Sequence, residues 1–233
     1  MRSKKSALYI ALLTLTFILS GCTAGPTYVT KGSEFPKMYE QQPRSLLILP
    51  PMNISTDAEA KDYYMTTIEM PFAMMGYYTF PVEMVGDVMK QEGVYDTEIL
   101  YNLPANKFYD YFGADAVLFT KITKWDLSYM VLASTLTVAI EAKIVSTKTS
   151  EELWRYTGMV RVDLSGGGDS GGSMAGLLIK VVATAVNSAA ADYVTYARQA
   201  NSRLIYSLPV GPYHEAYMQD QNMQLVDQTP KDQ

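Results

Sequence analysis

The 233-residue sequence contains one cysteine, one histidine and no cluster of Lys and Arg in its body. A single cysteine excludes an internal disulfide, and together with a single histidine it excludes a Cys/His zinc site. The net charge is −5 at pH 7. An acidic chain without a basic cluster is a poor partner for DNA or RNA, because binding to phosphates depends on Lys and Arg. Hydrophobic residues make up 48% and charged residues 18%, a composition typical of a folded domain.

The N-terminus has the pattern of a lipoprotein signal peptide. Arg2, Lys4 and Lys5 precede an apolar run over 7–19, which is too short to span a bilayer comfortably. Leu19-Ser20-Gly21-Cys22 then matches the bacterial lipobox. In that chemistry a diacylglycerol is attached to the thiol, the signal is cut before the cysteine, and the new amine is acylated, for example with palmitate. We therefore predict a signal peptide over 1–21 and lipidation at Cys22; the alternative is an uncleaved anchor with a chance cysteine.

The residues after Cys22 indicate where the anchor places the protein. Thr23 stands where an Asp would be the usual inner-membrane retention signal of enteric-type bacteria. This favours the outer membrane, with the domain facing the periplasm. Several acyl chains make such attachment effectively permanent. Residues 22–44 are rich in Gly and Pro and predict a flexible tether, with a reach of about 70 Å when fully extended.

Residues 45–208 have the pattern of an α/β domain. The apolar run 45–49, stopped by Pro50 and Pro51, is typical of a strand buried on both faces. The rest of the first half of the domain predicts a second strand over 77–80 and helices over 57–75, 82–91 and 103–112. Pro71 should kink or divide the first of these helices near its end.

The second half of the domain changes character. Residues 116–130, 135–146 and 152–164 are long, β-branched segments, and the middle one alternates apolar and polar residues with a period of two. They predict an antiparallel three-stranded meander. A glycine loop over 166–172 and a long helix over 173–206 follow, and 209–233 predicts a loose polar tail. The expected fold class is α/β: a mixed-sheet αβ sandwich with a C-terminal meander and a long packing helix.

Two glycine-rich motifs invite a catalytic or nucleotide-binding interpretation, and neither has its required context. Residues 168–172 spell the nucleophile motif of trypsin-like proteases around Ser170, but the only histidine, His214, follows the serine in a predicted tail. Gly166, Gly168 and Gly171 form a dinucleotide-binding spacing, but no strand follows the helix to complete a βαβ unit. We predict no catalytic residues, no cofactor and no metal site.

Candidate partner-binding residues come from two segments. Pro51, Met52 and Asn53 form a stiff turn after the first strand, at the carboxyl edge where ligand clefts of open α/β sheets lie. Tyr77 and Tyr78 belong to a tyrosine-rich set typical of protein interfaces. The alternative for Asn53 is that it only satisfies the backbone of its own turn.

A further candidate patch consists of Met70, Met74 and Met75, which suits either a soft partner-binding surface or plain core packing.

Several short motifs resemble known families. Gly113–Leu118 with Ile122 and Trp125, and Ile144–Thr149 followed by Leu153-Trp154, resemble the signature of the curli-secretion-channel superfamily, which shares a fold with the N-terminal domain of TolB. Closer still, Pro51-Met52-Asn53, Met70-Pro71-Phe72 and Gly76–Val82 resemble motifs of a family of bacterial lipoproteins of unknown function that includes a meningococcal vaccine candidate. The resemblance implies an αβ sandwich and genes beside a curli-channel-like lipoprotein. It implies no activity and no catalytic residues.

These observations favour a non-catalytic outer-membrane lipoprotein whose tethered domain binds another envelope protein in an assembly or transport complex. The expected partners are membrane lipid, through acylated Cys22, and other envelope proteins such as a curli-channel-like lipoprotein; nucleic acid is not expected. Two alternatives stay open: a subunit of an oligomeric, curli-channel-like secretion complex, which would make the protein a homo-oligomer, and a cell-envelope hydrolase.

Overall fold

The protein is represented by a computed structural model that describes residues 28–130, 133–163, 178–179 and 193–226. Its main sheet is mixed and has the strand order β4-β2-β5-β6-β7-β8, with β3 paired to β5 beyond the end of β2. The strands are β2 (Ser45–Ile48), β3 (Met52–Asn53), β4 (Tyr78–Phe80), β5 (Ala116–Met130), β6 (Ala133–Ser146), β7 (Glu152–Asp163) and β8 (Leu178–Ile179). β2 runs parallel to β4 and β5, whereas β5, β6 and β7 form an antiparallel meander.

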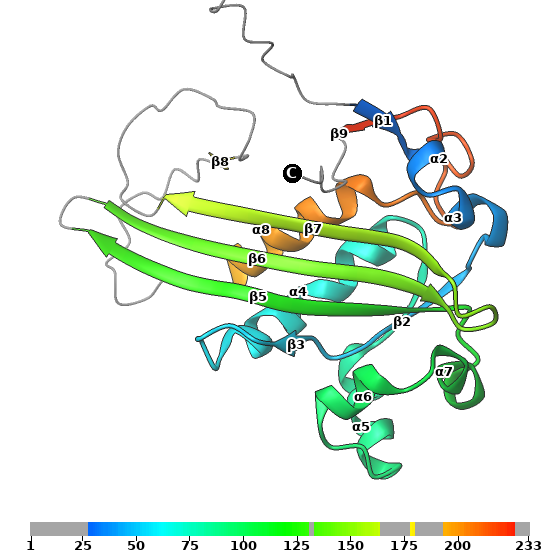
Figure 1. Cartoon of the computed structure of the whole chain (residues 1–233), viewed down its shortest axis with the longest axis horizontal. Coiled ribbons are helices and arrows are strands. Elements are labelled where there is room, and N and C mark those ends of the chain that lie inside the picture. Colours follow the sequence, from blue (N-terminus) through cyan, green and yellow to red (C-terminus); the bar gives the residue numbers. More distant parts are fainter. Residues whose placement is uncertain (1–27, 131–132, 164–177, 180–192, 227–233) are drawn as a thin grey trace, which may run out of the picture.

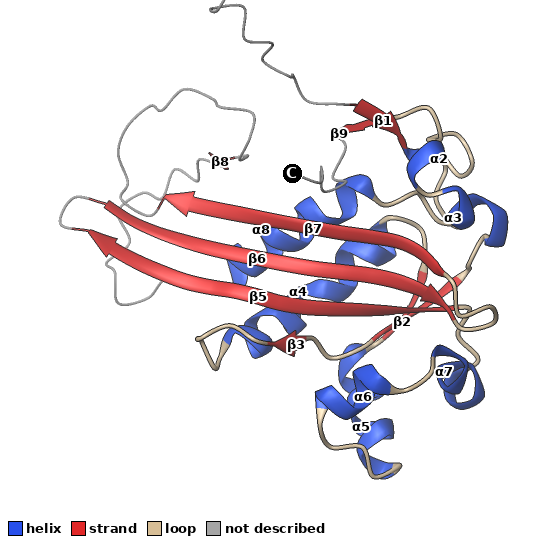
Figure 2. Cartoon of the chain, in the orientation of Figure 1, coloured by secondary structure: helices blue, strands red, loops and turns tan. Residues whose placement is uncertain are grey.

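Helices lie on both faces of the sheet, so the predicted mixed-sheet α/β sandwich is confirmed (Figures 1 and 2). On one face α4 (Ala60–Met74) and α8 (Tyr193–Leu204) pack against each other and against the meander. On the other face α5 (Val82–Gln91), α6 (Thr97–Asn102) and α7 (Ala105–Phe112) pack near β2 and β5. β2 lies between these layers: Leu46 and Ile48 belong to one core cluster and Leu47 to the other. Its predicted burial on both faces is therefore confirmed.

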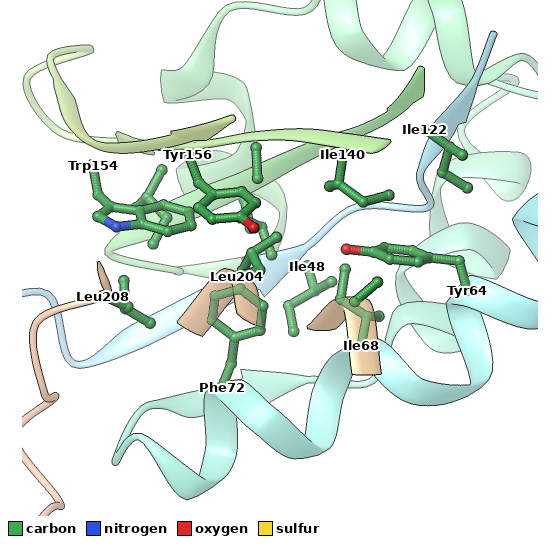
Figure 3. Close-up of a cluster of buried hydrophobic side chains, with 14 of the residues drawn as sticks. Ile48, Tyr64, Ile68, Phe72, Ile122, Ile140, Trp154, Tyr156, Leu204 and Leu208 are labelled. Atoms are coloured by element: carbon green, nitrogen blue, oxygen red, sulfur yellow. The ribbon is translucent and has the colours of Figure 1, made fainter. Parts of the chain in front are cut away.

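The larger core joins the meander to α4 and α8 (Figure 3). Ile122, Ile140 and Trp154 extend from the strands toward Ile68 and Phe72 of α4 and Leu204 of α8, and all six are buried. The indole N–H of Trp154 donates to the Ser207 hydroxyl at 3.2 Å, so this large side chain is buried with its polar atom satisfied.

A β-bulge keeps β5 in the core along its length. The pairing with β6 shifts between Ile122 and Lys124, so that Ile122 lies opposite Ile140 and Trp125 lies opposite Val138. Ile122 and Trp125 are three residues apart, so in a regular strand their side chains would project from opposite faces of the sheet. The extra residue brings both into the same core.

Proline and glycine set the helix boundaries as predicted. Pro81 precedes α5, and Gly93 follows it with a φ of 85°. Pro104 precedes α7, and Gly113 closes it with a φ of 66° in the left-handed region that glycine tolerates. α6 was not predicted. Its sequence signal is Asp96, whose carboxylate accepts a hydrogen bond from the Glu98 amide at 2.8 Å and caps the helix.

Two predicted flexible segments are folded over their described parts, and the prediction is wrong there. Residues 28–41 form β1 (Tyr28–Thr30), α2 (Lys31–Glu34) and α3 (Pro36–Gln41). After α8, the chain forms the 3₁₀ helix η1 (Ile205–Ser207) and returns to β9 (Gln224–Val226), which pairs antiparallel with β1. Phe35, Met38 and Leu225 are buried in the larger core. This burial of apolar surface outweighs the Gly and Pro content of the first segment and the polar composition of the second, on which the prediction of flexibility was based.

The predicted long helix over 173–206 is confirmed for its end, as α8, and is wrong at Leu178–Ile179, which form the strand β8 beside β7. The glycine loop over 166–172 and the signal peptide lie outside the described residues. Within the described ranges, no helix is long and apolar enough to cross a membrane.

Candidate interaction surfaces

The sheet separates the two groups of predicted partner-binding residues. Because β2 is parallel to β4, Tyr78 lies beside Ser45 at the start of β2, whereas Met52 and Asn53 follow its end. Tyr77 is buried, and its hydroxyl donates to the Pro209 carbonyl at 2.7 Å. Tyr77 is therefore a core residue and presents no surface to a partner. Tyr78 is exposed and lies edge-on to Phe80.

The turn after β2 uses the Asn53 side chain for its own structure. The Asn53 amide nitrogen donates to the Asp57 carbonyl at 2.7 Å. Its oxygen accepts from the Ser55 backbone N–H at 3.0 Å and from the Ser55 hydroxyl at 2.7 Å. Pro51 is buried beside it. These contacts are those that the alternative interpretation of Asn53 as a turn residue expects.

Met52 lines a cavity of about 390 Å³ on the outer face of the meander. We call it the Lys143 cavity. Its wall combines aromatic, apolar and charged side chains from β3, α6 and all three meander strands: Met52, Tyr101, Phe119, Lys121, Glu141, Ala142, Lys143, Glu152, Arg155, Tyr156 and Thr157.

Tyr101 fixes one wall of the Lys143 cavity. Its hydroxyl oxygen accepts from the Thr120 amide at 2.8 Å and from the Met52 amide at 3.3 Å, and it donates to the Thr120 carbonyl. Burial raises the pKa of Tyr101 well above its ordinary value, with the two backbone N–H donors acting in the opposite direction. The tyrosine therefore stays neutral and ties β3 to β5.

The strand register brings the charged side chains of the cavity together. Phe119, Lys143 and Arg155 lie directly opposite one another on β5, β6 and β7. Two residues further along each strand, on the same face, lie Lys121, Glu141 and Thr157. Side chains opposite one another in a ladder project from the same face. Lys121 pairs with Glu141 at 3.5 Å, and Arg155 pairs with Glu152 at 3.3 Å.

Of the three positively charged side chains of the cavity, Lys121 and Arg155 form these ion pairs and Lys143 does not. Its ammonium group lies over the Phe119 ring, 5.3 Å from the ring centre, and forms no ion pair within 4.0 Å with any residue that the structure describes. Its neighbour across the ladder is Arg155, and like charges directly opposite each other are unfavourable. An incoming carboxylate could pair with Lys143 and relieve this repulsion, with Phe119 and Met52 providing apolar contact.

The described residues contain no set of three or more His, Cys, Asp or Glu side chains close enough to hold a metal ion. The Nδ1 atom of His214 accepts a hydrogen bond from the Ala216 amide at 3.0 Å, and Ser170 lies outside the described residues. On α4, Met70 and Met74 are exposed while Phe72 is buried, so core packing was the wrong interpretation of those two methionines.

Sequence reasoning missed the charged residues of the Lys143 cavity. The alternation of the middle strand places Glu141 and Lys143 on one face, which was a usable signal. The neighbour relation between Lys143 and Arg155 depends on the register of two strands, and the register shift between Ile144 and Val145 has no marker in the sequence.

Comparison with known proteins gives a consistent result. The profile of the family described as "Putative lipoprotein GNA1162-like" matches residues 33–211. The "Putative lipoprotein NMB1124/NMB1162" of Neisseria meningitidis serogroup B is 29% identical over 222 residues, which cover 94% of this chain and 97% of the relative. The crystal structure of lipoprotein GNA1162 from Neisseria meningitidis has a TM-score of 0.51 at 30% identity, covering 54% of this chain and 88% of that one.

A more distant likeness is to the PelC dodecamer from Paraburkholderia phytofirmans, with a TM-score of 0.44 at 10% identity, covering 71% of this chain and 87% of that one. The family match spans the whole meander and every buried residue of the two core clusters except Leu225. The resemblance noted from the Pro51–Asn53 and Gly76–Val82 motifs is thus confirmed, and the chain belongs to the GNA1162-like family of lipoproteins.

Proposed function

We propose that this lipoprotein is acylated at Cys22, held at the periplasmic side of the outer membrane, and binds another envelope protein through the Lys143 cavity. It acts without catalysis, as a subunit of an assembly or transport complex. The observation that carries the proposal is the placement of Lys143 opposite Arg155, in a cavity with an aromatic floor. The partner group that fits this cavity is a carboxylate carried on an apolar or aromatic segment.

The charge of the cavity supports an acidic partner. Its wall carries Lys121, Lys143 and Arg155 against Glu141 and Glu152, which is one positive charge in excess. The chain as a whole is acidic, with a net charge of −5, so this surface differs from the average of the molecule. A local field of opposite sign accelerates and orients the encounter with an acidic partner.

The anchor is tested with Cys22→Ala in the producing bacterium. Without the thiol, acylation and the cleavage that depends on it cannot occur, so the protein is expected either uncut or released from the outer membrane. Membrane fractionation and the mass of the N-terminal peptide measure both. If Cys22→Ala is cleaved and still fractionates with the outer membrane, lipid at Cys22 is not the anchor.

The cavity is tested by reversing its charge in the full-length protein. Lys143→Glu with Arg155→Glu is expected to weaken capture of the partner by about tenfold or more, because two attractive charges become repulsive. Lys90→Glu with Lys107→Glu is the matched control, since both lysines are exposed surface cations of α5 and α7. A photoreactive residue in place of Thr157 identifies the partner by cross-linking in living cells.

Each outcome has a defined meaning. Loss of the cross-link in the Lys143/Arg155 variant, with the control unchanged and the thermal midpoint kept, supports the cavity as the binding surface. A cross-linked product made of two copies of this chain would favour the alternative of an oligomeric secretion subunit. Equal capture by wild type and both variants would remove the cavity from the proposal.

A further inference from the structure

The chain offers only a short connection between its lipid anchor and its folded domain. Cys22 precedes Tyr28, the first residue of β1, by six residues. At 3.6 Å per residue, a connection of this length spans at most about 22 Å when fully extended. The reach of about 70 Å expected from the sequence is too long, because 28–44 belongs to the folded domain.

The start of β1 is attached firmly to the rest of the molecule. β1 pairs with β9 through Tyr28–Val226, Val29–Leu225 and Thr30–Gln224. Lys31 and Gly32 then donate backbone hydrogen bonds to the carbonyls of Met223 and Gln221, both at 2.9 Å. The short connection therefore ends on an element that cannot swing away from the domain.

This geometry limits how the domain can stand on the membrane. β5 alone has 15 residues, which corresponds to a length of about 50 Å. The connection is less than half as long, so the end of the domain that carries β1 and β9 must lie nearest to the lipid. Figure 1 shows that end at the upper right, away from α5 and α6 at the bottom of the view.

The surface at this end carries little charge and presents apolar side chains among neutral polar ones. Tyr28 and Val226 lie opposite each other on the two-stranded sheet and are 50% and 54% exposed, and Met223 is exposed nearby in sequence. Over 28–34 and 218–226 the charged residues are Lys31, Glu34 and Asp220, and the first and last neutralise each other in a buried ion pair. The remaining exposed polar groups of 218–226 include the amides of Asn222 and Gln224.

We propose that the β1–β9 end is a membrane-contact surface, on which Tyr28 and Val226 lie in the headgroup region of the bilayer that holds the acyl chains. Tyrosine suits that region, because its ring is apolar and its hydroxyl remains hydrated. A nearly neutral surface is compatible with a bilayer rich in zwitterionic lipid, which offers no strong attraction to either sign of charge. The inference rests on the proposed acylation of Cys22, because the anchored lipid is what holds the β1–β9 end close to the bilayer.

The test uses the full-length, acylated protein in vesicles of phosphatidylethanolamine with a minor share of phosphatidylglycerol. Photoreactive benzoylphenylalanine is placed at position 28, at position 226 or, as a control, at position 95. Tyr95 is exposed and lies between α5 and α6, at the other end of the domain. We expect about tenfold more lipid adduct from positions 28 and 226 than from position 95, since only the former lie at the interface.

Mass spectrometry of the N-terminal peptide shows whether Cys22 is acylated, so failure of the contact surface can be distinguished from failure of the lipid anchor. An acylated chain whose positions 28 and 226 label no more lipid than position 95 overturns the contact surface and leaves the anchor intact. A mature chain without acyl groups on Cys22 overturns both. Hydrogen exchange gives an independent measurement: the vesicle should slow exchange of exposed amides in 28–34 and 218–226, and unchanged rates there would contradict the contact.

Discussion

The ammonium group of Lys31 lies 3.2 Å from the carboxylate of Asp220, and both side chains are almost fully buried, at 3% and 10% exposure. The same ammonium donates to the Leu208 carbonyl at 2.8 Å. The Asp220 carboxylate also accepts from the Val210 amide at 3.0 Å and from the Tyr39 hydroxyl at 3.0 Å. Burial lowers the pKa of Lys31, and Asp220 opposes that shift. The pair joins the two ends of the described chain at one point.

Replacing Lys31 by Met should reduce the free energy of unfolding by about 3–5 kcal/mol, because it leaves the Asp220 charge buried without its partner. Chemical denaturation measures the loss. Lys37→Met is the control: Lys37 pairs with Glu151 at 2.8 Å, but the two side chains are 45% and 43% exposed. An exposed pair contributes about 1 kcal/mol or less. Equal losses from the two variants would show that the Lys31 pair is no more important than a surface pair.

Gly76→Ala should destabilise the protein far more than Gly93→Ala. Both glycines have positive φ, 83° and 85°, where a side chain costs about 1–2 kcal/mol. A Cβ on Gly76 would also lie 2.6 Å from the His214 Cβ, whereas a Cβ on Gly93 meets nothing within 4 Å. The difference between the two thermal midpoints therefore measures the close contact of the α4–β4 turn with the C-terminal segment. Equal midpoints would mean that the C-terminal segment moves away from the added Cβ at little cost in stability.

Asp115→Asn should lower stability at neutral pH and have little effect in acid. Burial alone would raise the pKa of Asp115, but hydrogen bonds from the Lys148 ammonium and from the Arg44 and Ser45 amides outweigh it, and the pKa is lowered. The Lys148 contact is 2.6 Å long. A carboxyl with a lowered pKa in the folded state contributes stability above its unfolded pKa of about 3.9 and loses it as the pH falls through the folded value.

The measurement for Asp115 is the free energy of unfolding from pH 7 down into acid, to below both the unfolded and the folded pKa of Asp115. Wild type and Asp115→Asn should differ at pH 7 and converge at the acid end. Asp87→Asn, at an exposed site on α5, is the control and should follow wild type throughout. A gap between wild type and Asp115→Asn that persists in acid would assign the loss to hydrogen-bond geometry and not to charge.

Asn53→Ala should lower the thermal midpoint while leaving partner capture unchanged. The variant leaves the Asp57 carbonyl and the Ser55 amide without their partner, which costs about 1–3 kcal/mol when such groups are partly buried. Capture is measured at a temperature where both proteins are folded. Weaker capture with an unchanged midpoint would restore Asn53 as a direct contact residue.

Helices and strands whose signals lie within their own residues could be predicted from the sequence. The alternation in 135–146 and the β-branched residues around it gave the meander almost to its ends, and Pro104 with Gly113 gave α7. What depends on distant residues could not. The pairing of Tyr28 with Val226 joins a Gly- and Pro-rich segment to a polar one, and both had been predicted to be flexible. The burial of Phe35, Met38 and Leu225 and the buried Lys31–Asp220 pair explain their order.

The candidate site divides in the same way. Met52 was predicted from the end of a buried strand, and it does line the Lys143 cavity. Tyr77 was misassigned because a buried tyrosine with its hydroxyl on the Pro209 carbonyl has the same local sequence as an exposed one. Lys143 and Arg155 become neighbours only through the register of β6 and β7.

The pairing of β1 with β9 also has a consequence for the order in which the molecule is completed. A chain is synthesised and exported from its N-terminus, yet the first described strand has the last described strand as its partner. Pairs so distant in sequence close late in folding. A chain truncated after residue 217 would therefore retain the central sheet with its helices and lack Asp220 and β9. The β1–β9 end of the domain is thus assembled only when the complete polypeptide has arrived, so full length is a condition for forming the proposed membrane-contact surface.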